Sequence, residues 1–112
     1  MGPPAAASVV LVRFPFSDLS QTKLRPAVVL ADAGRGDYIL CQVTSKPYGD
    51  SRAVIIDDPD FRQGSLRVRS FARPGKLFTA NIELIGAEVA VLQSSGFERI
   101  ISAVTELLRA GR

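Results

Sequence analysis

The residue types that are missing from this chain decide much of the chemistry open to it. The sequence contains no histidine and a single cysteine, Cys41. The lack of histidine excludes cysteine–histidine and serine–histidine–aspartate nucleophiles, paired-histidine ribonuclease sites and most zinc sites. Arginine then becomes the natural group for holding a phosphate, because its guanidinium is planar, permanently charged and able to form two parallel hydrogen bonds.

The basic residues are more informative by their position than by their number. The formal net charge is only +3, which permits nucleic-acid binding without demonstrating it. One basic group lies in the first half of the chain, and a second crowds a later stretch without an intervening acid: Arg13, Lys23, Arg25, Arg35 and Lys46, then Arg62, Arg67, Arg69, Arg73 and Lys76. We expect the second group to create a positive field wherever it folds.

Length and composition favour a single cytoplasmic domain. The chain has 112 residues, of which 46% are hydrophobic and 22% charged, as in ordinary globular proteins. We expect residues 1–7 to be a flexible N-terminus and residues 8–112 to form the domain. The N-terminus does not resemble a secretion signal, and no apolar run approaches the roughly 20 residues of a membrane helix. Cys41 lies in an apolar run and has no disulfide partner, so we interpret it as a buried side chain in a reducing compartment.

Short apolar runs separated by turn residues predict a mostly β protein. We expect loops at 17–24 and 45–51, a turn at 32–37, and strands at 9–12, 27–30, 38–44, 53–56 and 85–92. A stretch at 66–72, continued at 76–79, could be a further strand, and an irregular segment ends at Gly64. Five or six short strands with one terminal helix indicate a small barrel with the helix packed against it.

The terminal helix has the clearest pattern in the sequence. One apolar stripe recurs at helical spacing: Phe97, Ile100, Ile101, Val104, Leu107 and Leu108. Ser95 and Glu98 have the form of a capping box, and Gly111 is placed to end the helix.

The strand at 38–44 predicts which of its side chains face away from the core. Because side chains alternate along a strand, Ile39, Cys41 and Val43 are expected on the core face. Gln42 and Thr44 then point to the opposite side.

Three stretches carry a resemblance to a known family. They read VVLVRFPFSDLSQTKLRPAVVL from Val9 to Leu30, YILCQVTSKP from Tyr38 to Pro47 and SFARPGKLFT from Ser70 to Thr79. Their order and spacing resemble the MazF/PemK toxins of toxin–antitoxin systems. The resemblance implies an SH3-like barrel and a homodimer. It also implies metal-independent, sequence-selective cleavage of single-stranded RNA without a cofactor, and an antitoxin that blocks the groove with an extended acidic segment.

The resemblance implies catalytic roles for two residues. Arg25 matches the family's arginine in the R-P-A word, and Thr44 matches its threonine in the Q-[VI]-T-S stretch. A threonine hydroxyl can bond the phosphate or the 2′-oxygen. The simpler alternatives are a surface arginine at a strand start and a threonine that bonds its own loop backbone.

Further RNA contacts are implied for a second set of residues: Arg73, Ser45, Gln42, Lys23, Asp18 and Lys76. Gln42 either reads a base edge or is only solvated. Asp18 and Lys23 belong to a loop that covers the RNA groove in this family, although a mobile polar loop is the simpler interpretation of either residue.

The stretch around Arg73 also departs from the family. In the Kid/PemK branch, an arginine here stands two residues before an aspartate, and the pair acts as acid and base. Gly75 occupies the aspartate position and cannot take a proton. Asp57, Asp58 or Asp60 is an alternative acid, and a site based on Arg25 and Thr44 is favoured.

The departure keeps two other functions open. One is an SH3-like module that has lost catalysis and binds RNA or a protein. The other is a CcdB-like inhibitor that binds DNA gyrase through its terminal helix, because one fold supports several functions.

Overall fold

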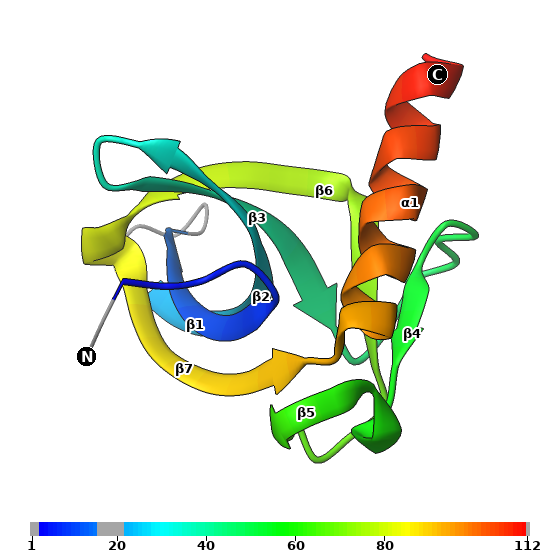
Figure 1. Cartoon of the computed structure of the whole chain (residues 1–112), viewed down its shortest axis with the longest axis horizontal. Coiled ribbons are helices and arrows are strands. Elements are labelled where there is room, and N and C mark those ends of the chain that lie inside the picture. The colour runs from blue at the N-terminus through cyan, green and yellow to red at the C-terminus, as the bar shows by residue number, and fades with distance from the viewer. Residues whose placement is uncertain (1–2, 16–21, 112) are drawn as a thin grey trace.

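The structure is a computed structural model that describes residues 3–15 and 22–111 (Figure 1). The chain forms a curled antiparallel sheet and one terminal helix, which confirms the predicted mostly β fold. The strands are β1 (Ser8–Pro15), β2 (Thr22–Gly34), β3 (Asp37–Thr44), β4 (Val54–Ile56), β5 (Phe61–Gly64), β6 (Ser70–Asn81) and β7 (Ile85–Leu92). Helix α1 spans Ser94–Ala110, and two 3-10 turns, η1 (Asp58–Asp60) and η2 (Ile82–Leu84), precede β5 and β7.

The first and last strands of the chain, β1 and β7, pair with each other in the sheet. Its strand order is β4-β6-β3-β2-β1-β7-β5, and every pairing among these strands is antiparallel. The last strand, β7, therefore returns to pair with the first, and the strands curl around a common centre (Figure 1). Helix α1 packs against β6, β4 and β7 at one side of this curl.

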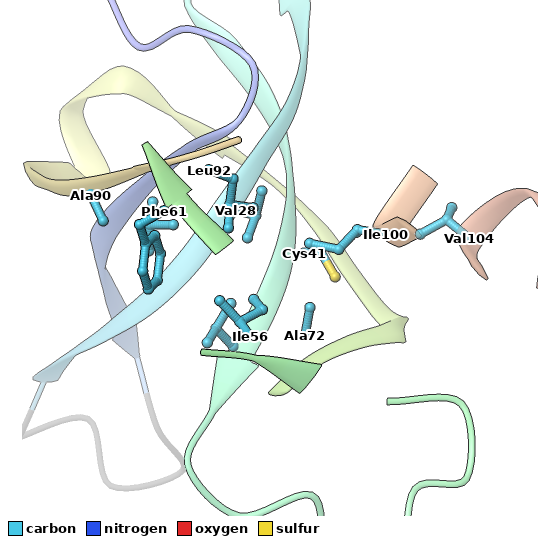
Figure 2. Close-up of a cluster of buried hydrophobic side chains, with 11 residues drawn as sticks. Val28, Cys41, Ile56, Phe61, Ala72, Ala90, Leu92, Ile100 and Val104 are labelled. Carbon is cyan, nitrogen blue, oxygen red and sulfur yellow. The ribbon is translucent and has the colours of Figure 1, made fainter. Parts of the chain in front are cut away.

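Two apolar clusters stabilise the sheet. The first, the helix-side cluster, comprises Val9, Val28, Cys41, Val43, Ile56, Phe61, Ala72, Ala90, Leu92, Ile100 and Val104 (Figure 2). The second, the far cluster, comprises Val10, Val12, Ala27, Val29, Tyr38, Leu40 and Ala80. Neighbouring residues of β1, β2 and β3 belong to different clusters, as Val9 and Val10 do, because side chains on a strand point to opposite faces. These three central strands are thus packed on both faces.

This double packing corrects one expectation for β3. Cys41 and Val43 are buried as predicted, but Ile39 is only half-buried. Tyr38 and Leu40, on the opposite face, are 5% and 0% exposed because they belong to the far cluster. Only at the end of β3 does this second face become polar, at Gln42 and Thr44.

The helix prediction is confirmed in its position and end but not in its start. Ile100 and Val104 are buried four residues apart, and Gly111 ends the helix with a left-handed φ of 71°. The capping box is wrong: the N-cap is Gln93, whose side chain makes no capping bond. The backbone amide of Gln93 donates to the Asp60 carbonyl at 2.8 Å, and the helix begins at Ser94, two residues after the end of β7. Leu108, expected in the stripe, is 67% exposed.

Three segments of the sheet also differ from the prediction. β2 is 13 residues long and begins at Thr22, so Lys23 lies in a strand and not in a loop. β5 was missed, because only Phe61 of its four residues is buried. Residues 66–69 are not a strand: Arg67 has a left-handed φ of 67°, and β6 begins at Ser70 and continues without interruption to Asn81.

The N-terminal segment is partly held by the sheet. Ala7 packs against the helix-side cluster, and its amide donates to the Val29 carbonyl at 2.9 Å. Flexibility of residues 1–7 as a whole stays a prediction. Within the described ranges, no helix is long and apolar enough to cross a membrane.

Candidate functional site

The main candidate site is a cleft of about 670 Å³ at the polar end of β2 and β3. Its walls come from β2, the end of β3, the β3–β4 connection, the segment before β6 and a bulge in β6. The residues that line it are Arg25, Pro26, Gln42, Val43, Thr44, Ser45, Lys46, Tyr48, Leu66, Val68, Ser70, Arg73 and Lys76.

Strand register brings the two predicted catalytic residues to the same part of the sheet. Ala27 of β2 pairs with Gln42 of β3. Continuing this antiparallel register by two residues on each strand aligns Arg25 with Thr44. Paired residues point to the same face of a sheet. Arg25 and Thr44 therefore lie on the face whose other end carries the far cluster. The sheet face is therefore apolar at one end and forms the cleft at the other.

The Thr44 hydroxyl is oriented by its own loop. The oxygen Oγ1 accepts a hydrogen bond from the Lys46 amide at 3.1 Å. This is the backbone contact foreseen as the simpler alternative. It also leaves the hydroxyl hydrogen able to donate, because a hydroxyl carries one donor in addition to its acceptor lone pairs.

A bulge in β6 brings Arg73 and Lys76 to the cleft. Cys41 pairs with Leu77 and Val43 pairs with Ala72, so β6 advances five residues where β3 advances two. The extra residues bend out of the ladder opposite Gln42.

Arg73 is anchored below the cleft surface. Its Nε donates to Asp50 Oδ2 at 3.0 Å, and the two side chains are 18% and 16% exposed. The hydrogen bond from Arg73 is the main cause that lowers the pKa of Asp50, and a second bond from the Arg52 amide acts in the same direction. Asp50 is therefore a carboxylate at neutral pH. The Arg73 guanidinium also lies over the Tyr48 ring, 5.8 Å from its centroid.

The lining of the cleft is basic. It contains four cationic side chains, Arg25, Lys46, Arg73 and Lys76, and no acidic side chain among the described lining residues. Arg73 forms an ion pair with Asp50, whereas Lys46 and Lys76 are exposed. This arrangement suits a polyanion that lies along the surface.

Two arginines of the second basic group are paired with acids, which offset part of the positive field expected from it. Arg69 pairs with Asp57 at 3.1 Å, and Arg73 pairs with Asp50. Acids distant in sequence therefore lie beside these arginines, which a reading of residues 62–76 alone could not reveal.

The acids proposed as replacements for a family aspartate lie outside the cleft. Asp57 pairs with Arg69, Asp58 accepts from the Ser65 hydroxyl at 2.7 Å, and Asp60 pairs with Arg99 at 3.0 Å. None of the three lines the cleft.

Gly75 does not line the cleft either. A Cβ added at Gly75 would lie 3.7 Å from the Leu107 side chain of α1. A side chain at this position would therefore begin against the helix.

Cys41 is buried below Arg73. Its thiol donates to the Arg73 carbonyl at 3.2 Å. Burial is the largest cause that raises its pKa to about 12, so the thiol is protonated and unreactive at neutral pH. This confirms the interpretation of Cys41 as a small buried residue.

The structure brings together most of the residues singled out from the sequence: Arg25, Gln42, Thr44, Ser45, Arg73 and Lys76. Lys23 is exposed on β2 and is not part of the cleft lining, and Asp18 lies outside the described residues. Sequence reasoning missed Tyr48, Lys46 and the segment 66–70. The pattern Pro47-Tyr48-Gly49, an aromatic residue inside a turn, was the available signal for the first. Among residues 3–15 and 22–111, no group of three or more His, Cys, Asp or Glu side chains is placed to hold a metal ion.

Comparison with known proteins identifies similar structures. No protein-family model and no curated protein sequence matches the chain. Among solved structures, MazF in a MazE–MazF crystal form from Deinococcus radiodurans superposes with a TM-score of 0.79 at 20% identity, covering 97% of this chain and 98% of that one. Mycobacterium tuberculosis toxin MazF-mt6 gives 0.71 at 14% identity, covering 91% and 96%. A mycobacterial endoribonuclease in complex with its cognate antitoxin gives 0.72 at 13% identity, covering 97% and 96%. The chain therefore has the fold of the MazF toxins.

Proposed function

We propose that this protein is the toxin of a type II toxin–antitoxin pair and a metal-independent endoribonuclease that cuts single-stranded RNA. The observation that carries the proposal is the basic cleft in which Arg25 and Thr44 align on one sheet face. The fold neighbours support it, since they include toxins and endoribonucleases. Fold alone does not assign an activity, whereas the basic cleft supplies groups that can act on a phosphate.

The proposed reaction uses the substrate's own 2′-hydroxyl. The 2′-oxygen attacks the adjacent phosphorus, and the bond from phosphorus to the 5′-oxygen breaks. The proton lost by the 2′-oxygen is balanced by the proton that the 5′-oxygen gains. The products are a 2′,3′-cyclic phosphate and a 5′-hydroxyl.

Arg25 and Thr44 are assigned to the charge that builds on the phosphate. The Arg25 guanidinium pairs with the non-bridging oxygens of the phosphorane, where a permanent cation stabilises the transition state more than the ground state. The Thr44 hydroxyl, oriented by the Lys46 amide, donates its hydrogen to the same phosphate. Arg73, Lys46 and Lys76 hold neighbouring phosphates, and Ser45 and Gln42 contact the sugar or base.

The same cleft is proposed as the antitoxin site. A cleft lined by cations would hold an extended acidic segment through the contacts that hold RNA phosphates. A cognate antitoxin of this kind would inhibit cutting by direct competition. A homodimer and a cytoplasmic location complete the proposal.

The test compares RNA cutting by matched variants. A long single-stranded RNA is incubated in EDTA with the wild type and with Arg25→Ala, Thr44→Val and Arg109→Ala. Arg109 is exposed at the end of α1 and controls for the loss of one positive charge. Discrete cuts by the wild type and Arg109→Ala, with at least a hundredfold loss in Arg25→Ala, are expected. Equal cutting by folded Arg25→Ala would refute the assignment.

A further inference from the structure

An aromatic ring that is not part of either apolar cluster lies at the rim of the cleft. Tyr48, in the β3–β4 connection, is 72% exposed, more than any other large hydrophobic side chain of the described residues. It lines the cleft together with Lys46 and Arg73. An exposed aromatic beside a row of cations is the combination that single-stranded nucleic acids need: stacking for the bases and charge for the backbone.

Tyr48 occupies a backbone position that normally rejects a bulky residue. The Asp50 amide donates to the Pro47 carbonyl at 3.0 Å, which closes a four-residue turn. Tyr48 and Gly49, the two central residues, have φ of 54° and 73°. Two positive φ values define a type I′ turn, in which asparagine or glycine is preferred at the position of Tyr48. A strained residue that is also exposed points to a use outside the fold.

Arg73 and Asp50 restrict the position of the Tyr48 ring. The Arg73 guanidinium lies 5.8 Å from the ring centroid, within the range of a cation–π contact. Arg73 is fixed in turn by Asp50, which also accepts a bond from the Arg52 amide at 2.9 Å. The turn and the ion pair therefore restrict where the ring can go, and an ordered ring loses less entropy when a ligand stacks on it.

We infer that Tyr48 is a stacking platform for one unpaired nucleobase of a strand whose phosphates lie along the basic lining. The inference rests on the proposed function and adds a base contact to it. Every nucleobase has a π face, so the ring contributes affinity for single strands and not the choice of base. Arg73 and Asp50 act as positioning residues for the ring.

The experiment separates stacking from charge. The probe is a labelled random-sequence heptamer with 2′-O-methyl riboses, which cannot be cut through a 2′-hydroxyl. A heptamer with the same sugars and phosphates but no bases is its partner probe. Binding of both is measured by fluorescence anisotropy with the wild type, Tyr48→Asn, Tyr48→Phe and Leu108→Ala. Asparagine removes the ring and suits the turn, and Leu108 is an exposed control on α1.

Tyr48→Asn should bind the base-bearing heptamer about tenfold more weakly and the abasic heptamer unchanged. Tyr48→Phe and Leu108→Ala should stay within about twofold of the wild type. The asparagine variant should melt no lower than the wild type, which shows that the loss is not one of folding. Unchanged binding in Tyr48→Asn, or an equal loss on both probes, overturns the inference and leaves the proposed function standing. If the wild type binds neither probe, the RNA function fails and the inference fails with it.

Discussion

Asp50 provides a test of how the cleft is held in shape. Its carboxylate accepts one bond from Arg73 Nε at 3.0 Å and one from the Arg52 amide at 2.9 Å. A hydrogen bond to a charged group contributes about 1.5–3 kcal/mol and a neutral bond about 1 kcal/mol. Asp50→Ala removes both bonds, so we expect the free energy of unfolding to fall by about 3 kcal/mol. Asp50→Asn loses the charge and keeps an oxygen acceptor for only one of the two donors, since its amide nitrogen cannot accept a hydrogen bond, so we expect a loss of about 2 kcal/mol.

The pH dependence follows from the direction of the pKa shift. The pKa of Asp50 is lowered in the folded protein, chiefly by Arg73. Its contribution is therefore fully present above the unfolded pKa, close to 3.8, and is lost as the pH falls through the lower, folded value. The wild type and Asp50→Asn should differ equally at pH 7 and pH 5. They should converge in strong acid, where the protonated carboxyl resembles the amide.

Urea unfolding at pH 7, 5 and 2.5 measures this difference. Asp57→Asn is the matched control, because it removes the same charge from the pair with Arg69, whose side chains are 63% and 35% exposed. Such an exposed pair contributes less than about 0.5 kcal/mol. A loss in Asp50→Asn that is no larger than in the control, or that persists unchanged at pH 2.5, would show that the Asp50 carboxylate does not stabilise the fold through Arg73.

Three further predictions concern packing and reactivity. Gly64→Ala should lower the free energy of unfolding by at least about 3 kcal/mol, since φ is 71° and a Cβ would clash with the Val89 carbonyl oxygen of β7. Gly34→Ala, with φ of 90° and open space, should cost only about 1 kcal/mol in the same urea titration. Cys41, with its pKa near 12, should resist a thiol reagent at pH 8 in the native protein and react after unfolding; rapid labelling of the native form would contradict its burial. Gly75→Asp should leave the rate of RNA cutting within about threefold, because its side chain would begin against α1; a large gain would place an acid in the site after all.

Local sequence patterns predicted the elements whose structure depends mainly on neighbouring residues. The helix is marked by Ile100 and Val104 one turn apart and by Gly111 at its end, and these features are confirmed. Its start was mispredicted because Gln93 is held by the Asp60 carbonyl, a contact across 33 residues of chain (93 − 60) that no local motif encodes. β5 was missed for a similar reason, since Phe61 alone of its residues is buried and pairing with β7 defines the strand.

The resemblance predicted single residues of the candidate cleft, but it could not predict the contacts that tertiary pairing gives them. Arg25 and Thr44 were identified separately, and the β2–β3 register explains why they lie together. The pairing of Arg73 with Asp50 depends on a bulge in β6 and a turn in another loop. Tyr48 escaped notice because the value of an exposed ring depends on what lies beside it.

Removing the attacking 2′-hydroxyl from the substrate tests the proposed chemistry directly. An RNA is first cut by the wild type in EDTA, and the cleavage position is mapped. The same RNA is then synthesised with a single 2′-deoxyribose immediately 5′ of the scissile phosphate. We expect this one change to abolish cutting there, and the unmodified RNA to yield 2′,3′-cyclic phosphate and 5′-hydroxyl ends. Cutting of the deoxy-substituted RNA at the same position would contradict the proposed chemistry.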